Sequence, residues 1–285
     1  MQTHAANPTV LQLGGGFIRV YFSARDAEKK ASIGWAVFDL NKLGAGALEV
    51  SKDPVLIPGD PGTFDDSGVS MGCFATTGDD LRLYYLGWNL GVTVPWRNSI
   101  GLAVSKDGGL SFKRHSLSPL LDRCHVDPYS ISYPWVLPRG VEDWLIWYGS
   151  NLSWGSGKKQ EEMAHVIKIG SSKDGLNWFR KGKIAIDFKG SEEFAMSKPC
   201  VIKDGEIYRM WYSYRGKAYN IGYAESDDGE TWIRHDEKSG IKASDSGWDS
   251  KSIEYPCVFD EIGARWMIYN GNSYGLTGFG LAIQD

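Results

Sequence analysis

The chain has 285 residues, of which 42% are hydrophobic and 23% are charged, so it can bury a large core. Its formal net charge of -4 leaves no basic footprint, which argues against nucleic acid as a partner. No stretch approaches the length of a membrane span, and the first residues lack the basic and apolar regions of a signal peptide. We therefore expect a soluble cytoplasmic protein without a membrane partner.

A short apolar pattern recurs five times along the chain. Its equivalent positions lie at intervals of 63, 63, 65 and 57 residues and are Pro8, Met71, Pro134, Pro199 and Pro256. A period of this size in a chain rich in short strands is typical of a β-propeller. We predict an all-β fold, a five-bladed β-propeller formed by a single domain over residues 1–285. Each proline should begin the innermost strand of a blade, near residues 8–13, 71–76, 134–138, 199–203 and 256–260.

Further strands follow each innermost strand. The second strands are dense in aromatic and β-branched residues and are expected at 18–23, 81–86, 144–148, 208–212 and 266–269. Third strands are expected at 33–37, 100–104, 167–171, 221–225 and 279–283. The last unit has only 30 residues from Pro256 to Asp285, which is room for three strands. We therefore predict that the fifth blade lacks an outer strand.

Asp-Gly turns precede the outer strands of blades two to four, within residues 105–109, 172–175 and 226–229. They resemble the Asp-box of sialidase-like propellers, which marks a fold and not a catalytic site. If each first strand runs from the top face to the bottom face, these turns lie at the bottom. The residues before each first strand and after each second strand then share the top face with the long excursions 91–98 and 152–164. Long loops on one face of a repeat scaffold usually mark the binding face.

The four cysteines are predicted to be small packing residues of the core. They are Cys73, Cys124, Cys200 and Cys257, and three of them follow the proline position of a repeat closely. They form no CxxC pair and no metal-ligand spacing. We accordingly expect neither a metal nor a cofactor.

The chain resembles the five-bladed propeller superfamily of glycoside hydrolase families 43 and 32. The segments that carry the resemblance are VYFSARD (20–26), FDDSGV (64–69), YLGWN (85–89), MWYSYRG (210–216) and YNGN (269–272). They are most similar to bacterial proteins labelled as glycosidases and linked to surface-polysaccharide gene clusters. The resemblance implies a carbohydrate as the ligand. However, Asn7 stands where family 43 has its catalytic base and Ser132 where it has its acid, so no catalytic residue transfers directly.

Glycoside cleavage requires two carboxyl groups that flank the bond. Glu254 lies two residues before Pro256, the offset of the family acid but in the fifth blade, and should face the axial funnel. Its alternative role is that of a buried glutamate paired with an arginine. Asp66 and Glu193 lie on the top-face approach of blades two and four, and either could complete the catalytic pair or merely be solvated.

Other polar and aromatic residues of the same face are candidates for substrate binding. Arg25 and Arg215 follow equivalent second strands and could clamp an anionic group, or instead form an inter-blade salt bridge to Asp26 or Glu254. Trp88 could carry a sugar ring on its face. The remaining candidates are Asn89, Asp127, Asp249, Asn270 and Asn272. Aspartates also cap turns, which is the alternative role for Asp127 and Asp249.

Three functions remain open at this point. The first is a glycoside hydrolase or a related glycan-modifying enzyme that acts on a bacterial polysaccharide or its precursor. The second is a glycosyl-transferring enzyme or phosphorylase, which one acid and an arginine-lined phosphate site would favour. The third is a glycan-binding protein without catalysis, which Asn7 and Ser132 would permit. Fold alone does not choose among them.

Overall fold

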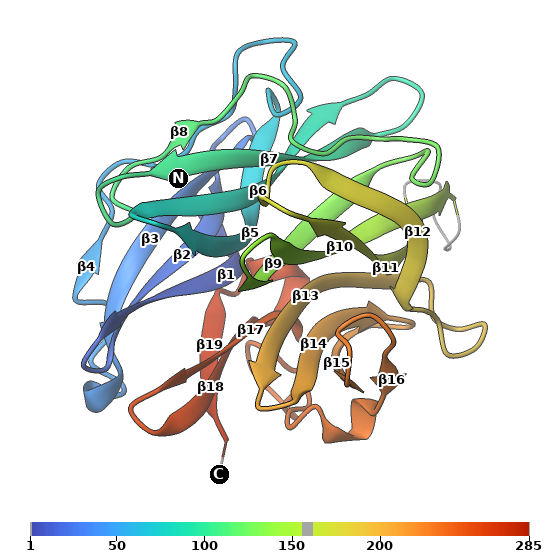
Figure 1. Ribbon diagram of the computed structural model, residues 1–285. Helices are drawn as coiled ribbons and strands as arrows, with labels where there is room; N and C mark the ends of the chain where they lie inside the picture. The colour runs from blue at the N-terminus through green and yellow to red at the C-terminus, as the bar shows by residue number, and fades with distance from the viewer. Residues whose placement is uncertain (1, 156–161, 285) are drawn as a thin grey trace.

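The computed structural model describes residues 2–155 and 162–284 and is almost entirely β (Figure 1). Its strands form five successive antiparallel units, so the predicted five-bladed β-propeller is confirmed. The innermost strands gather at the middle of the ring, as Figure 1 shows. They are β1 (Thr3–Gly14), β5 (Gly68–Thr77), β9 (Ile131–Gly140), β13 (Ala195–Asp204) and β17 (Glu254–Glu261).

The other strands surround these five. The second strands are β2 (Phe17–Arg25), β6 (Asp80–Leu90), β10 (Asp143–Trp154), β14 (Ile207–Arg215) and β18 (Ala264–Asn270). The third strands are β3 (Ala31–Asp39), β7 (Trp96–Ser105), β11 (Met163–Ser172), β15 (Tyr219–Ser226) and β19 (Phe279–Ile283). The outer strands are β4 (Glu49–Val50), β8 (Lys113–Arg114), β12 (Trp178–Ile186) and β16 (Ile233–Arg234). Short helical turns complete the chain: η1 (Leu40–Lys42), η2 (Asp236–Lys238) and α1 (Asn272–Gly275).

The fifth blade is a three-stranded sheet, β17-β18-β19, in the part of the chain that the structure describes. The prediction that it lacks an outer strand is therefore confirmed. The blades are separate units at most seams, but single parallel bridges join β3 to β5 and β11 to β13.

The prediction that each proline begins an innermost strand is wrong. Pro8, Pro134, Pro199 and Pro256 lie inside their strands, where the pairing with the second strand is interrupted by a bulge. A bulged residue leaves the hydrogen-bonded ladder, so the missing amide hydrogen of proline costs nothing there. In blade 2, Cys73 pairs with Tyr84 as Cys200 pairs with Trp211, so Gly72 and not Met71 holds the proline position.

Each Asp-Gly turn binds the blade before it. The hydroxyl group of Tyr21 donates to the carbonyl of Gly109 at 2.8 Å, and that of Tyr84 donates to Gly175 at 2.9 Å. The indole of Trp147 donates to Gly229 at 3.0 Å in the same way. The turns therefore connect neighbouring blades and act as structural elements, as their resemblance to a fold marker implied.

The core consists of five apolar clusters, and each fills one seam between two neighbouring blades. The cluster between blades 3 and 4, for example, joins Trp147 and Ile167 to Met196 and Met210. Burial at about 25 cal/mol per Å² of apolar surface makes these seams the main source of stability. The blades are thus held together face to face around the ring.

An aspartate also connects the second and outer strands in blades 2, 3 and 4, and it is buried in blades 2 and 3. Asp127 is fully buried and accepts hydrogen bonds from Tyr148 at 3.0 Å and Arg180 at 2.8 Å, with Lys168 at 3.1 Å. The same tyrosine–aspartate–arginine arrangement recurs in the other two blades as Tyr85–Asp65–Arg114 and Tyr212–Asp236–Arg234. Because the arginine comes from the outer strand, blade 5 retains only the pair Tyr269–Asp249, at 2.9 Å.

The difference between these aspartates predicts unequal losses of stability. Asp127→Ala leaves the buried cations of Lys168 and Arg180 without their counter-charge, and should lower the free energy of unfolding by about 3–5 kcal/mol. Asp249→Ala removes only the partner of one tyrosine hydroxyl group and should cost about 1 kcal/mol. Urea denaturation of both variants measures the difference. Equal losses would show that the ion pairs add nothing to blade 3.

Candidate functional site

Glu254 begins β17 and is 1% exposed. Its Oε1 accepts the backbone N–H of Tyr274 at 2.7 Å, whereas its Oε2 is buried and has no hydrogen-bond partner among the residues described. Burial raises the pKa of Glu254 to about 8, although the Tyr274 amide and the nearby Arg215 oppose this shift. Glu254 is therefore a protonated carboxylic acid at neutral pH, and its Oε2 is buried without a partner among the described residues.

The turn that touches Glu254 has an unusual backbone. Ser273 and Tyr274 adopt left-handed conformations with φ of 62° and 59°, and Gly275 follows at 85°. Non-glycine residues rarely adopt this conformation, and such strain often accompanies functional sites. Asn272 supports the turn, because its Oδ1 accepts the N–H groups of Lys251 at 2.7 Å and Ser252 at 3.1 Å.

Arg215, at the end of β14, connects this turn to blade 3. Its Nη1 donates to the hydroxyl oxygen of Tyr274 at 3.3 Å, and its Nη2 pairs with Oε1 of Glu162 at 3.1 Å. The guanidinium group also lies over the rings of Phe194 and Tyr219, 5.1 and 5.4 Å from their centroids. Arg215 thus forms an inter-blade salt bridge, but with Glu162 and not with Asp26 or Glu254, the partners that the sequence suggested.

Four tyrosine side chains cluster near Glu254. Tyr133 and Tyr255 lie 5.5 Å apart between ring centroids, and Tyr219 lies 6.4 Å from Tyr255 and 5.8 Å from Tyr274. Burial raises the pKa of each of these phenols, so all four remain protonated at neutral pH. They offer apolar ring faces together with hydroxyl groups, which is the lining that suits a sugar.

His165 in β11 adds a neutral group near Arg215. Burial lowers the pKa of His165 to about 4, with a further decrease from the charge of Arg215. Its Nδ1 lies 3.2 Å from the carbonyl oxygen of Met163. Sequence patterns singled out neither His165 nor Glu162, Tyr133, Tyr219 and Tyr274. The only hint was that residues 152–164 form a long excursion on the predicted top face.

The two proposed partners of Glu254 bind other groups. Asp66 accepts hydrogen bonds from Asn89 at 2.7 Å, Ser67 at 2.8 Å and the amide of Gly62 at 2.9 Å, so it holds a turn of blade 2. Glu193 forms a two-point ion pair with Arg234, at 2.8 and 2.9 Å. Neither contacts Glu254 within residues 2–155 and 162–284, and their catalytic roles stay predictions.

The predicted binding residues differ in how many contacts they make with the rest of the protein. Asp127 and Asp249 belong to the buried arrangements described above. Asn270 accepts the amide of Asn7 at 2.8 Å, so it fixes the backbone next to the funnel. Trp88 packs over Gly68, where an added Cβ would lie 2.2 Å from the indole ring. Arg25 is exposed at the end of β2, and burial, together with the charge of Arg25, lowers the pKa of His4.

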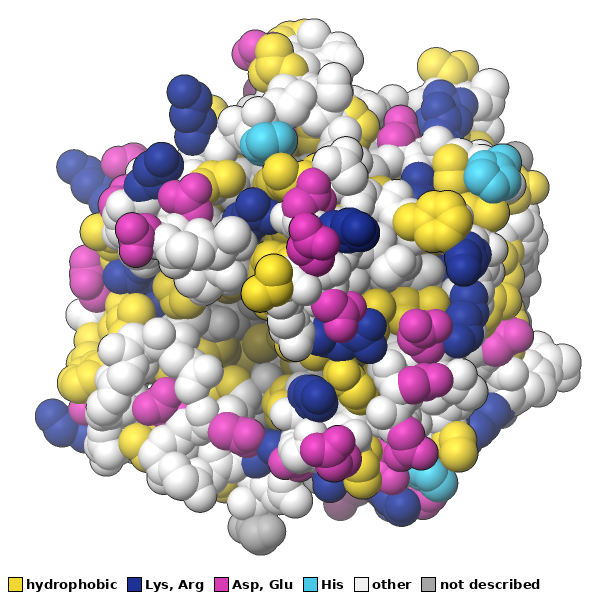
Figure 2. All heavy atoms as spheres, viewed as in Figure 1, with side chains coloured by type: hydrophobic (Ala, Val, Ile, Leu, Met, Phe, Trp, Pro, Cys, Tyr) yellow, Lys and Arg dark blue, Asp and Glu magenta, His cyan; other side chains and the backbone are white. Residues whose placement is uncertain are grey.

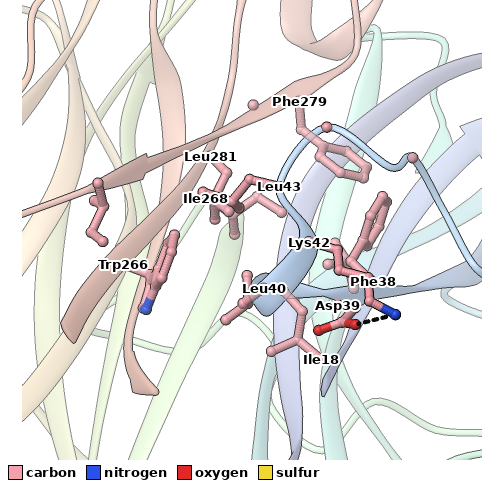
Figure 3. Close-up of a pocket in the computed structure, with 15 residues that line it drawn as sticks. Ile18, Phe38, Asp39, Leu40, Lys42, Leu43, Trp266, Ile268, Phe279 and Leu281 are labelled. Atoms are coloured by element: carbon pink, nitrogen blue, oxygen red, sulfur yellow. Dashed lines mark ion pairs between the residues drawn. The ribbon is translucent and has the colours of Figure 1, made fainter. Parts of the chain in front are cut away.

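A cavity of about 480 Å³ lies away from Glu254, between blades 5 and 1 (Figure 3). Its lining is apolar, with Trp266, Ile268 and Phe279 facing Phe38 and Leu40. A second cavity of about 490 Å³ lies between β12 and β16. Neither is lined by the Asp-Gly turns or by Glu254. The first cavity lies beside β19, the edge strand of blade 5, and residues 42–44 and 46 of blade 1 also line it.

Other features bear on possible ligands. No group of three or more His, Cys, Asp or Glu side chains in the described ranges is placed to hold a metal ion. No helix among the same residues has the length and apolar character needed to cross a membrane. Acidic and basic side chains are intermingled over the face shown in Figure 2, without a continuous patch of either charge.

Comparison with known proteins identifies the class of fold. No family model matches the chain. Its fold is shared with five-bladed propellers of glycoside hydrolases: a family-43 glycoside hydrolase described as thermostable superposes with a TM-score of 0.71 at 17% identity, covering 99% of this chain and 89% of the other. BT0996, solved in a complex with RGII, gives a TM-score of 0.74 at 15% identity, with 98% and 86% covered.

A third solved structure comes from work on the GH130 family of mannoside phosphorylases, which contains glycoside hydrolases that target beta-1,2 mannosidic linkages in Candida mannan. It superposes with a TM-score of 0.71 at 15% identity, over 99% of this chain and 84% of the other. In sequence, the chain is 46% identical over 284 residues to the uncharacterized protein MT1551 of Mycobacterium tuberculosis strain CDC 1551, which covers 100% of this chain and 93% of that protein. The uncharacterized protein Rv1502 of strain H37Rv matches equally, at 46%. The chain belongs to the family of these mycobacterial proteins.

The buried acid makes stability depend on pH in a predictable direction. A glutamate ionises near its usual pKa when unfolded, but near 8 in the folded protein. The folded state therefore holds more protons between these values, and stability falls as pH rises, by up to ~1.4 kcal/mol per pH unit. Glu254→Gln should remove this decrease, so the variant gains stability relative to the wild type from about pH 5 to pH 8. Urea unfolding of both proteins at several pH values tests this. The prediction is contradicted if the free energy of unfolding depends on pH in the same way for the wild type and the variant.

Proposed function

We propose that the protein is a glycoside-cleaving enzyme of the glycan-modifying kind, acting on a bacterial polysaccharide or its precursor. The observation that carries the proposal is Glu254, a buried and protonated carboxyl group whose Oε2 has no hydrogen-bond partner in the described structure. General acids of glycosidases need a raised pKa, so that they hold a proton at the pH of the reaction. The shared fold supports a carbohydrate ligand without identifying it.

In this proposal Glu254 donates its proton to the glycosidic oxygen as the bond to the anomeric carbon breaks. The tyrosine faces of Tyr133, Tyr219, Tyr255 and Tyr274 pack against the apolar side of the sugar ring. Arg215 orients the substrate through Tyr274 and stabilises negative charge that develops beside it. The leaving alcohol departs neutral, and Glu254 is left as a carboxylate that regains its proton from solvent.

Phosphorolysis is the second candidate. One observation favours it: Arg25 is exposed at the end of β2, close enough to influence Tyr133, and could hold a phosphate ion. Phosphate would then attack the anomeric carbon in place of water, with the same acid protonating the leaving oxygen. A sugar phosphate as product would separate this reaction from hydrolysis.

Glu254→Gln tests the proposal directly. A thermal-shift and activity screen against oligosaccharides, sugar acids, sugar phosphates and nucleotide sugars first identifies a substrate of the wild type. On that substrate the variant should lower kcat by about a hundredfold or more, the usual scale of general acid catalysis, while the fold is retained. The wild-type kcat should also fall as pH rises above about 8, because the acid loses its proton there.

Glu225→Gln is the matched control. Glu225 accepts a hydrogen bond from Tyr223 at 2.7 Å near the far end of β15 from Tyr219, so this variant should keep its activity. Normal turnover by Glu254→Gln would make Glu254 a structural residue. Binding of a glycan without turnover would favour the non-catalytic alternative, and absence of any binding at millimolar concentration would overturn the carbohydrate proposal.

A further inference from the structure

We propose that Trp96 and Trp154 form a platform that binds one sugar unit of a glycan chain, across the ring from Glu254. The inference rests on the proposed function for the chemical class of its ligand, a carbohydrate, and it specifies a chain of several units. The two indole rings lie 5.3 Å apart between centroids and cross at 72°, so the edge of one ring meets the flat side of the other. Each ring therefore keeps at least one flat face that its partner does not cover.

The platform lies on two hairpins that are longer than those of the other blades. From equivalent positions, the second strand continues for four residues in blades 1 and 4 and for two in blade 5, but for six in blade 2 and seven in blade 3. At about 3.3 Å per residue, the β6–β7 and β10–β11 hairpins extend roughly 7–10 Å beyond those of blades 1 and 4. The equivalent positions are Tyr21, Tyr84, Trp147, Trp211 and Ile268.

The two tryptophans occupy the same place on these hairpins. Trp96 pairs with Leu90 in the last pair of β6 and β7, and Trp154 pairs with Met163 in the last pair of β10 and β11. Glu254 pairs with the last residue of β18, so it lies at the same end of its blade. The platform and the buried acid therefore share one face of the propeller.

Neither tryptophan belongs to the core. None of the five apolar clusters includes either ring. Trp88, by contrast, packs over Gly68, as described above. Both rings of the pair are partly exposed, and the indole N–H of each has no hydrogen-bond partner within residues 2–155 and 162–284. Exposed aromatic surface that does not contribute to the core is typical of a binding site.

The chemistry of the pair suits a sugar. The apolar side of a sugar ring packs against the face of an indole, while the indole N–H donates to a hydroxyl group. Arg97, next to Trp96, is exposed and donates to the hydroxyl oxygen of Thr93 at 3.4 Å. An arginine has five N–H donors, so Arg97 has others for the hydroxyl groups or an anionic substituent of the same sugar.

The position of the platform implies a ligand of several units. In a ring of five, blade 5 borders blades 4 and 1, so blades 2 and 3 lie on the opposite side, as Figure 1 shows. The hairpin of Trp154 is also fixed to the blade-4 side of the candidate site. The amide of Gly155 donates to the carbonyl of Glu162 at 2.7 Å, and Glu162 pairs with Arg215 at 3.1 Å. A glycan that reaches both the platform and Glu254 must cross the mouth of the ring.

Affinity electrophoresis tests the platform, in native gels that contain mannan, arabinan or rhamnogalacturonan. At least one of these polymers should retard the wild type. Trp96→Ala and Trp154→Ala should each raise the Kd for that polymer by about ten- to a hundredfold, because a stacked ring is lost. Trp96→Phe and Trp154→Phe keep a ring face and should stay within a few-fold of the wild type.

Kinetics distinguish binding at the platform from catalysis. On a polymer that the enzyme cleaves, the two alanine variants should raise KM and leave kcat unchanged, because the platform contacts the chain away from the reacting bond. The same variants should bind single sugars as the wild type does. Phe179→Ala is the matched control, since it removes a ring that is 63% exposed on β12, outside the platform.

The outcomes separate this inference from the proposed function. Equal retardation of the wild type and both alanine variants overturns the inference alone, and so does a wild type that none of the three polymers retards. If the phenylalanine variants lose binding as fully as the alanine variants and all four melt at lower temperature, the pair is a packing element. Polymer binding that depends on the platform, without cleavage of any glycosidic bond, supports the inference while the proposed function fails.

A lipid surface is the competing partner, because Leu90 and Val92 are also exposed on the blade-2 hairpin, at 74% and 105%. Sedimentation with vesicles of phosphatidylcholine and phosphatidylglycerol distinguishes the two. The wild type should stay in the supernatant. Sedimentation that Trp96→Ala and Trp154→Ala abolish would assign the pair to a membrane surface and overturn the sugar platform.

Discussion

Two side chains of the innermost strands connect the blades, and much of the ring depends on them. The indole of Trp135 packs against four of the five apolar clusters and donates to the carbonyl of Val201 at 2.9 Å. The amine of Lys198 is fully buried 6.0 Å from the Trp135 ring, and donates to Thr9 at 3.1 Å and to the carbonyl of Gly72 at 2.8 Å. A buried amine needs such partners, so Lys198 fastens blade 4 to blades 1 and 2.

The bulges of the innermost strands determine which residues lie near the middle of the ring. Asn7, Tyr133, Lys198 and Tyr255 all have positive φ next to a proline, which turns these positions out of the regular pleat. The freed amide groups are bound by the blade before: Asn7 donates to Asn270 at 2.8 Å, and Tyr255 donates to Ser213 at 2.7 Å. The same bulge, repeated in four innermost strands, therefore positions an asparagine, two tyrosines and a lysine near the middle of the ring.

The repeat itself was predictable because its signals are local. The apolar period, the Asp-Gly turns and the short last unit gave the propeller and its incomplete fifth blade, and a fixed offset from Pro256 pointed to Glu254. Roles that depend on distant partners were not predictable. Nothing near Asp127 or Glu193 in sequence reveals that Arg180 and Arg234, 53 and 41 residues away, bind them. Glu162 and Tyr274 enter the site only through loop conformations that no period describes, and the prolines misled because a bulge tolerates them as well as a strand start does.

The energetically unfavourable features of this structure are concentrated around Glu254. A carboxyl group is buried with an oxygen that lacks a partner in the described chain, and its neighbour Tyr274 is held in a conformation that costs roughly 1–3 kcal/mol. A glutamate with a purely structural role would be expected to form an ion pair, as Glu193 does with Arg234. The five seams supply enough apolar burial to tolerate an unsatisfied acid, and natural proteins usually depart from good local structure at functional sites. Glu254 differs in this respect from the buried Asp65 and Asp127, because both of those are paired with basic side chains while Oε2 of Glu254 has no partner among the described residues.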